Sequence, residues 1–243
     1  MTDTTRYTHD SAFKSVLHDL NAVKEFIDHF LSPELAALID KDTIKAISDT
    51  YFDKSLGQRS SDSLFEATIQ NESALLALLF EHKYDTMGIV PLQILKYLTG
   101  NWEKNLKNKK PLTHIIPIIV YHGDEKTNYK SLYSYFKYKN PLLKIFVPDF
   151  QCIFVNVNRI ADEILFDLSD TTALKSLFLI FKHIDNPEFL RQNLDKIVKF
   201  ALENENLSEQ LTQLLLYLLN NSALIFEDIE PILDTLPEVA QKK

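Results

Sequence analysis

The chain has 243 residues, of which 45% are hydrophobic and 25% are charged, and its formal net charge is −8. These values are ordinary for a globular protein, and the length allows one large domain or two small ones. Cys152 is the single cysteine, which excludes an internal disulfide and an all-cysteine zinc site. No apolar run approaches about 18 residues and the first residues lack an apolar signal core. We therefore expect a cytoplasmic protein without a membrane span.

The first part of the chain predicts an α/β domain. Apolar residues recur at helical spacing from Asp10, which together with Ser11 can cap a helix, to about Leu31. Ser32-Pro33 then ends this helix and starts another turn. Alternating or β-branched runs predict strands at residues 43–52, 61–69, 74–83, 114–121 and 150–156. A helix over about residues 89–106 separates the third strand from the fourth, with a break allowed at Gly100.

One proline bears on the order of the strands. Pro117 lies inside the run 114–121 and lacks the backbone N–H that a strand donates. We therefore expect this strand to lie at a sheet edge or to be bulged at Pro117.

After Asn158 the pattern changes to helices alone. They are expected over about residues 161–167, 171–184, 187–203, 207–220 and 223–235. The sequence thus predicts an α/β domain over residues 1–158 and a helical region over 159–243. The stretch Gln210–Leu219 is strongly apolar, which indicates either a core helix or a helix that binds a partner, including a second copy of the chain.

The residues that indicate a function lie on two neighbouring predicted strands. Asp62 begins the strand 61–69, and Glu81 and Lys83 end the strand 74–83. A hairpin folded about the polar residues 70–73 brings Asp62 beside residues 81–83. Side chains alternate between the two faces of a strand, so two of the three registers place Asp62 on the face of Glu81 and Lys83.

Two neighbouring carboxylates repel each other unless a cation or a proton relieves them. Mg2+ takes oxygen ligands and keeps positions for water and a substrate phosphate. A lysine beside such an ion can position or deprotonate the water, or neutralise charge on the phosphate, which is the chemistry of phosphodiester hydrolysis. An ion pair between Glu81 and Lys83 at a solvated strand end explains the same residues without catalysis. Residues 74–80 are apolar on both faces, as in a buried strand, and this favours the functional interpretation.

Basic residues gather in two segments despite the net negative charge. The first segment holds Lys104, Lys107, Lys109 and Lys110, and the second, residues 126–148, holds lysines at 126, 130, 137, 139 and 144 without any acid. Tyrosines and Phe136 lie between the lysines of the second segment. Lysines neutralise phosphates and aromatic rings stack on bases. The alternative is a solvated amphipathic segment with half-buried tyrosines.

The order of these motifs resembles the restriction-endonuclease-like PD-(D/E)XK superfamily, with an αβββαβ core and a mixed sheet. Within it, the chain is similar to the Rpn family of recombination-promoting nucleases, also named as transposases. The resemblance rests on His9-Asp10-x-x-Phe13-Lys14-x-x-Leu17, on Arg59-Ser60-Ser61-Asp62-x-Leu64, on Phe80-Glu81-His82-Lys83 and on Pro117-Ile118-Ile119-Val120-Tyr121-His122-Gly123. It covers about residues 9–157, and Ser61 replaces the proline of the superfamily name.

The resemblance implies a metal-dependent DNA endonuclease. Asp62, Glu81 and the carbonyl of His82 would hold Mg2+, for which Mn2+ or Ca2+ are alternatives, and Lys83 would serve the water. Gln93 and Tyr97 resemble the Gln-x-x-x-Tyr element of RecB-like nucleases, although Tyr97 also fits a core position. Asp10 is a candidate accessory acid or a helix cap. Candidate DNA contacts are Lys107, Lys109, Lys110, Lys130, Lys137 and Lys139.

Two other functions remain open from the sequence. One is a catalytically weak or inactive module with the same fold, which binds DNA or a protein through its helical half. The other is an inhibitor or toxin–antitoxin partner that uses Leu211–Leu219 as its interface. An intact Asp62, Glu81 and Lys83 favours the nuclease, since two carboxylates placed together without a function would only repel.

Overall fold

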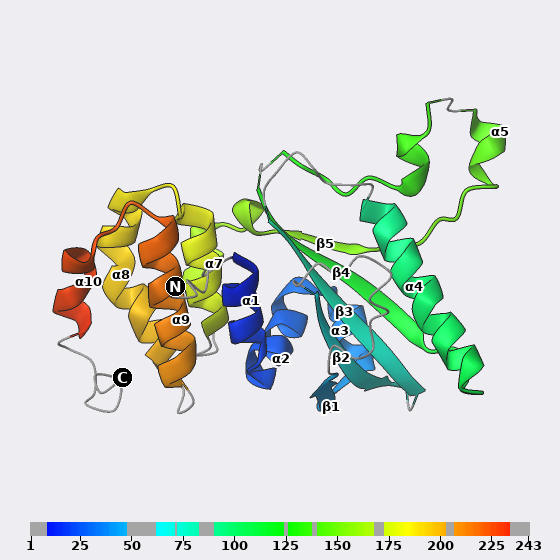
Figure 1. Ribbon diagram of the computed structural model, residues 1–243, viewed down its shortest axis with the longest axis horizontal. Helices are drawn as coiled ribbons and strands as arrows, with labels where there is room; N and C mark the ends of the chain where they lie inside the picture. Colours follow the sequence, from blue (N-terminus) through cyan, green and yellow to red (C-terminus); the bar gives the residue numbers. More distant parts are fainter. Residues whose placement is uncertain are drawn as a thin grey trace, which may run out of the picture. The chain divides into compact units, whose positions relative to one another are not determined.

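The computed structural model describes residues 9–47, 62–70, 72–82, 90–123, 126–137, 140–167, 173–202 and 207–233. They form a mixed five-stranded sheet and helices, so the chain is an α/β protein, as the sequence predicts (Figure 1). Contacts divide the chain into two compact units. One is Ser32–Asn156, here called the sheet unit, and the other joins Met1–Leu31 to Val157–Lys243 and is called the helical unit.

The sheet unit contains every strand that the structure describes. Its elements are α3 (Pro33–Leu38), β1 (Ile39–Ala46), β2 (Asp62–Ile69), β3 (Glu72–His82), α4 (Val90–Lys107), β4 (His114–His122), η3 (Leu132–Tyr135), α5 (Pro141–Lys144) and β5 (Ile153–Asn156). The strands lie in chain order, β1-β2-β3-β4-β5. The first three are antiparallel, whereas β3, β4 and β5 are parallel.

The β2–β3 hairpin has a shorter turn than the sequence predicts. Ile69 pairs with Glu72, so the loop has two residues and begins at Gln70, whose φ is 49°. A positive φ at the first loop position is typical of type I′ turns, whose twist matches that of the strands. The predicted pairing of Asp62 with residues 81–83 is therefore wrong by two to four residues: Asp62 is opposite Leu79. The polar residues 72–73, expected in the turn, begin β3 instead.

β4 is not an edge strand, contrary to the expectation from Pro117. It pairs with β3 along its whole length, and Pro117 is opposite Ala77. On its other side, however, β5 pairs only with Ile118–Tyr121. β4 therefore has no described strand partner on the β5 side at Pro117, and an N–H missing on that side would cost no ladder hydrogen bond.

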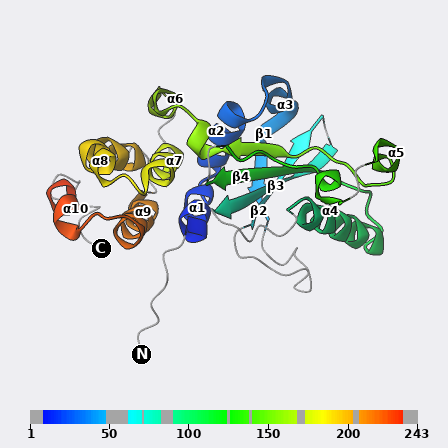
Figure 2. The same ribbon diagram turned by 90° about the horizontal axis from the view of Figure 1, so that it is seen from above.

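α4 covers one face of the sheet (Figure 2). The helix contributes Val90, Ile94, Tyr97 and Leu98 to the core between helix and sheet. These residues pack with Leu64, Leu75, Ile119 and Tyr121 of the strands. The break allowed at Gly100 is absent, because the helix continues to Lys107. After it, Lys109 adopts a φ of 55°, and the N–H groups of Lys109 and Lys110 donate to the carbonyls of Leu106 and Asn105. This pattern is a Schellman cap.

The helical unit begins with two helices where the sequence predicts one. α1 (His9–Leu17) ends before a turn, and α2 (Leu20–Phe30) starts after Asp19, whose carboxylate accepts from the N–H of Asn21 at 2.9 Å. Asp19 is thus a helix cap, and it breaks the continuous helix predicted from the apolar spacing. Asp10, proposed as a cap, instead lies in the first turn of α1.

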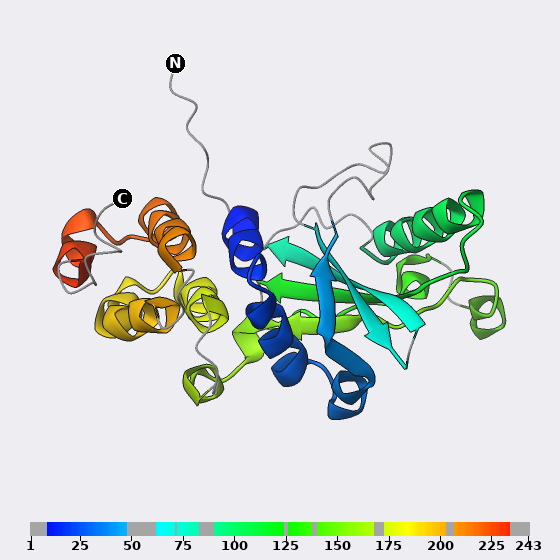
Figure 3. The ribbon, with the colours of Figure 1, turned by 90° about the horizontal axis from the view of Figure 1, so that it is seen from below.

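Further helices follow Asn156 in the described residues. They are η4 (Val157–Arg159), α6 (Asp162–Asp167), α7 (Ala173–His183), α8 (Pro187–Leu202), α9 (Leu207–Asn221) and α10 (Phe226–Leu233), and α7, α8 and α9 lie side by side (Figure 3). α1 packs on α7 and α9, and α2 packs on α7. For this reason the first 31 residues belong with these helices, although the sequence divides the chain at residue 158.

α7 is the central helix of this unit. The residues from Ala173 to Phe181 are all buried, including Lys175 and Ser176. The ring of Phe178 lies 6.5 Å from that of Phe26 and 5.3 Å from that of Phe30. Ser176 donates to the carbonyl of Ile197 on α8 at 2.5 Å, so its buried hydroxyl has a partner.

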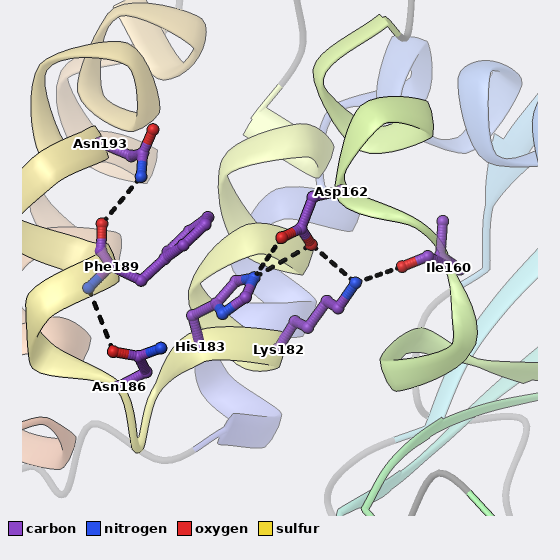
Figure 4. Close-up of polar contacts among 7 residues, drawn as sticks. All are labelled: Ile160, Asp162, Lys182, His183, Asn186, Phe189 and Asn193. Carbon is purple, nitrogen blue, oxygen red and sulfur yellow. Dashed lines mark hydrogen bonds and ion pairs between the residues drawn. The ribbon is translucent and has the colours of Figure 1, made fainter.

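A polar cluster joins the start of α6 to the end of α7 (Figure 4). The carboxylate of Asp162 lies 2.6 Å from Nζ of Lys182, and both of its oxygens lie 3.0 Å from Nε2 of His183. Lys182 also donates to the carbonyl of Ile160. The imidazole of His183 stacks on the ring of Phe189 with a centroid distance of 3.5 Å. These contacts connect η4, α6, α7 and α8 within the helical unit.

Within the ranges described, no helix combines the length and the apolar character that crossing a bilayer requires.

Candidate functional site

The candidate catalytic residues lie at one end of β2 and β3. Asp62 is opposite Leu79, and Glu81 follows two residues later on the same strand, so the positions of Asp62 and Glu81 are in the same phase of the pleat. The two predicted registers that place Asp62 and Glu81 on one face pair Asp62 with an odd-numbered residue of β3, as the observed pairing with Leu79 does. Diagonal positions of this kind are about 7–8 Å apart between Cα atoms. The side chains of Asp62 and Glu81, and all of Lys83, are outside the part of the chain that the structure describes.

The register also identifies the face of the sheet. The positions of Asp62 and Glu81 are in phase with Leu64 and Leu75, two strand residues that pack against α4. In the parallel pair β3–β4, Glu81 is opposite Tyr121 and His82 is opposite His122. This end is where the parallel strands finish, and ligands of open α/β sheets bind beyond the carboxyl ends of such strands.

Gln93 and Tyr97 have different surroundings on α4. Gln93 is exposed in the first turn of the helix. Tyr97 is buried, with 8% of its surface exposed, and belongs to the core against the sheet. Gln93 is thus accessible to a ligand near the start of α4, and Tyr97 has the core position that the sequence left open.

The side chain of Tyr121 leaves no room for a side chain at position 123, which is glycine. A Cβ at Gly123 would lie 2.2 Å from the hydroxyl oxygen of Tyr121. That hydroxyl lies 3.3 Å from Oγ1 of Thr127, to which it donates, and the side-chain amide of Asn156 donates to the carbonyl of Thr127 at 3.3 Å. Tyr121 and His122 are both buried. The Tyr-His-Gly motif therefore shapes the end of β4, next to Glu81 and His82.

The candidate DNA-contact lysines lie in two places. Lys107, Lys109 and Lys110 are exposed at the end of α4 and in its cap. Lys107 follows Gln93 by 14 residues, and therefore by about 21 Å along the helix axis. Lys130 and Lys137 are exposed in the connection between β4 and β5, whereas Lys139 is outside the described residues.

The accessory residues of the first helix belong to the helical unit. His9 is hydrogen-bonded through Nδ1 to the hydroxyl of Tyr217, and its ring lies 5.7 Å from that of Phe181. Burial, followed by the charge of Asp185, raises the pKa of Tyr217. Phe13 and Leu17 of the same motif are buried. The side chain of Asp10 is outside the described part, so its role as an accessory acid stays a prediction.

The described side chains include no group of three His, Cys, Asp or Glu residues arranged to hold a metal ion. The side chains of the expected ligands Asp62, Glu81 and His82 lie outside the described part of the chain. The metal site therefore stays a prediction from the sequence and the strand register.

One functional candidate is missing from the sequence interpretation. The helix α5 and the turn after it expose four large apolar side chains, Leu142, Leu143, Ile145 and Phe146. The sequence contains a signal for this feature, an apolar run that directly follows Pro141 and is interrupted only by Lys144. Such a run is indistinguishable from a buried segment until its exposure is known.

Comparisons with known proteins agree on one family. A family model described as "Putative transposase, YhgA-like" matches residues 7–212. The chain is 24% identical over 218 residues to "Recombination-promoting nuclease RpnD" of Escherichia coli O157:H7, which covers 89% of this chain and 82% of the relative. It is 23% identical over 214 residues to "Recombination-promoting nuclease RpnC" of Escherichia coli strain K12, covering 87% and 69%.

A third relative carries a different description. The chain is 21% identical over 217 residues to "Inactive recombination-promoting nuclease-like protein RpnE" of Escherichia coli strain K12, covering 89% of this chain and 71% of the relative. No solved structure matches the chain. The family model extends over both units and includes every residue proposed for the site. This chain therefore belongs to the YhgA-like transposase family, the family of the Rpn recombination-promoting nucleases.

Proposed function

We propose that this chain is a metal-dependent DNA endonuclease of the recombination-promoting type. The observation that carries the proposal is the register of β2 and β3, in which Asp62 and Glu81 occupy in-phase positions at the carboxyl end of the parallel strands. The relatives named as recombination-promoting nucleases support the same class of reaction. DNA as the substrate is part of the proposal.

The order of elements in the sheet unit supports a restriction-endonuclease-like core. A helix, three antiparallel strands, a helix and two parallel strands follow one another as α3, β1, β2, β3, α4, β4 and β5. This order is compatible with the αβββαβ core that the resemblance implies, with η3, α5 and β5 following β4. Charged residues at the end of the central strand β3 also fit an active site better than a structural ion pair.

The donor set fits Mg2+. Two carboxylates and one backbone carbonyl are hard oxygen ligands, and positions about 7–8 Å apart on adjacent strands are within reach of one ion between Asp and Glu side chains. With Mg2+ bound, the chemistry supplied is polarisation of the phosphoryl oxygen and a lowered pKa of a water. We assign Asp62, Glu81 and the carbonyl of His82 to hold the ion.

The chain's own residues would then orient the reaction. Lys83 would position the attacking water and stabilise the negative charge that develops on the phosphate. Gln93, exposed at the start of α4 on the covered face of the sheet, would contact the DNA or orient Asp62 or Glu81. Tyr97 would fix that part of α4 by its burial against the strands.

A plasmid-nicking assay in Mg2+ tests these roles. Asp62→Asn, Glu81→Gln and Lys83→Ala should each lower the rate of nicking by about 10²–10⁴-fold. The matched control is Glu72→Gln, which removes one carboxylate from an exposed position at the opposite end of β3 and should nick like wild type. Equal nicking by wild type and Lys83→Ala would refute the assignment of Lys83.

A second measurement detects metal binding through protein stability and does not depend on nuclease activity. Mg2+ that binds only the folded chain raises the free energy of unfolding by about 2.7 kcal/mol at 100 times its Kd. This stabilisation should be present in wild type and Glu72→Gln and absent in Glu81→Gln. In the absence of metal, Glu81→Gln should be at least as stable as wild type, because it removes repulsion between two carboxylates. Equal Mg2+ stabilisation of wild type and Glu81→Gln would exclude the proposed ligand set.

The second candidate function is a catalytically inactive module that binds DNA or a protein through its helical half. Similarity to a relative named as inactive favours it. In that case wild type and Lys83→Ala would be equally inactive in nicking, and Mg2+ would stabilise neither. The same two measurements therefore separate the candidates.

A further inference from the structure

The connection between β4 and β5 is built differently from the one between β3 and β4. The connection between two parallel strands usually contains a helix that packs on the sheet, as α4 does between β3 and β4. Residues 126–148, here called the arm, contain only the one-turn helices η3 and α5 in their described part. The three views show α5 at the outside of the sheet unit, apart from the strands (Figure 1).

The apolar side chains of the arm are exposed. Leu142, Leu143, Ile145 and Phe146, here called the apolar tip, are exposed by 77%, 50%, 81% and 77%. Four neighbouring large apolar side chains at this exposure are unusual on a monomeric protein, where patches of this kind mark interaction sites. At this exposure, these four side chains are not part of the buried core of the sheet unit.

Polar contacts hold the apolar tip in a defined shape. The side chain of Asn140 caps α5 by accepting from the N–H of Leu142 at 3.0 Å. The hydroxyl of Tyr133 donates to the carbonyl of Asn140 at 2.7 Å and connects α5 to η3. The N–H of Phe146 donates to the carbonyl of Leu143 at 3.1 Å. The arm is therefore an ordered turn that presents apolar groups to the outside.

The charge of the arm indicates the kind of partner. Residues 126–148 include lysines at 126, 130, 137, 139 and 144 and no Asp or Glu, although the whole chain has a net charge of −8. The described lysines of the arm are all exposed. A surface with only positive charges around an apolar centre is complementary to a polyanion that also offers apolar surface. Duplex DNA has both, phosphates outside and stacked bases within the grooves.

We propose that the arm is a DNA-binding wedge: the lysines contact phosphates, and the apolar tip enters a groove and separates a base step. Phe, Leu and Ile are residues that minor-groove proteins insert between base steps to kink the duplex. This inference rests on the proposed function for its substrate and adds a second contact, outside the catalytic site. The arm begins four residues after the end of β4, the strand in which Tyr121 is opposite Glu81.

Two other occupants fit the observations less well. A second copy of the chain would bring the lysines of two arms together, and like charges in an interface are unfavourable. A membrane surface binds amphipathic helices that are much longer than α5, which has four residues. Both alternatives are outcomes of the experiment below.

The test is binding of the full-length chain to a fluorescent DNA duplex in EDTA, where no metal-dependent cleavage competes. The triple variant Leu142→Ser, Ile145→Ser, Phe146→Ser should raise the Kd by about tenfold or more, without changing the salt dependence of binding. The double variant Lys137→Ala, Lys144→Ala should reduce the slope of log K against log salt by about two. 2-Aminopurine in the duplex should brighten with wild type, which unstacks it, and stay quenched with the triple variant.

The matched control removes two exposed apolar side chains that have acidic neighbours. Ile225→Ser, Phe226→Ser, at positions exposed by 57% and 52%, should bind DNA like wild type. Unchanged melting temperatures would show that all variants fold. Wild-type affinity of the triple variant overturns the proposal, as does a triple variant that loses only self-association in light scattering or only binding to anionic vesicles.

The outcome is independent of the nuclease assignment. Nicking by wild type together with wild-type DNA affinity of the triple variant would remove the wedge and leave the nuclease. Absence of nicking together with weakened binding by the triple variant would remove the nuclease and leave a DNA-binding chain.

Discussion

Replacing Asp162 by Asn should destabilise the helical unit, because its carboxylate is the centre of the cluster that joins α6 to α7 (Figure 4). Lys182 lies 2.6 Å from the carboxylate and His183 lies 3.0 Å from both oxygens. The side chains of Asp162, Lys182 and His183 are exposed by only 28%, 17% and 14%. Asn keeps the shape of the side chain and removes its charge.

The magnitude follows from these contacts. Hydrogen bonds to charged groups contribute about 1.5–3 kcal/mol each, whereas well-exposed ion pairs contribute about 0–1 kcal/mol. Asp162 is partly screened, and Asn can still accept one hydrogen bond. We therefore expect the free energy of unfolding to fall by about 1–3 kcal/mol.

The loss of unfolding free energy in Asp162→Asn should become smaller as the pH is lowered. Partial burial acts to raise the pKa of Asp162, but hydrogen bonds from Lys182 and His183 outweigh it, and the pKa is lowered. A lowered pKa in the folded state adds stability that is complete above the ordinary pKa of about 3.9 and is lost as the pH falls through the lowered value. The difference between wild type and Asp162→Asn should thus shrink below about pH 4.

Urea unfolding at pH 7 measures the loss, and a double-mutant cycle with Lys182→Met measures the coupling between the two side chains. Glu66→Gln is the control, since its carboxylate pairs with Nζ of Lys45 at 3.0 Å and these two side chains are more exposed, by 33% and 65%. It should lose much less stability than Asp162→Asn. Equal losses for the two variants, or no coupling between Asp162 and Lys182, would refute the argument that partial burial makes this cluster stabilising.

Three further substitutions test the backbone and the end of β4 by urea unfolding. Gln70→Gly should raise the free energy of unfolding by about 0.5–1 kcal/mol, since glycine adopts the φ of 49° without strain, and a lower value would contradict the turn. Gly123→Ala should lower it by about 1–3 kcal/mol, because the new Cβ meets the hydroxyl of Tyr121, and an unchanged value would show that the ring moves freely. Gly100→Ala, inside the uninterrupted α4, should raise it by up to about 1 kcal/mol, and a loss would indicate close packing at that position.

The candidate site shows how far sequence patterns reach. That Asp62 and Glu81 lie at the same end of two paired strands could be predicted, because a short polar stretch separates the two apolar runs. The register itself could not, because a loop of two residues and a loop of four are both compatible with polar residues at 70–73. Exposure of the apolar tip was hidden for a related reason: apolar composition does not say whether another element covers a segment.

The sequence by itself determined the α/β class, the positions of most helices and the family, because these depend on local periodicity and on motifs that are close in the chain. Tertiary structure alone decided that β4 lies inside the sheet despite Pro117, and that the first helices belong with those after Asn156. Those outcomes depend on contacts between distant segments, such as the short length of β5 and the packing of α1 on α7 and α9. The free energy of such contacts is set by which surfaces meet, and no single segment carries that information.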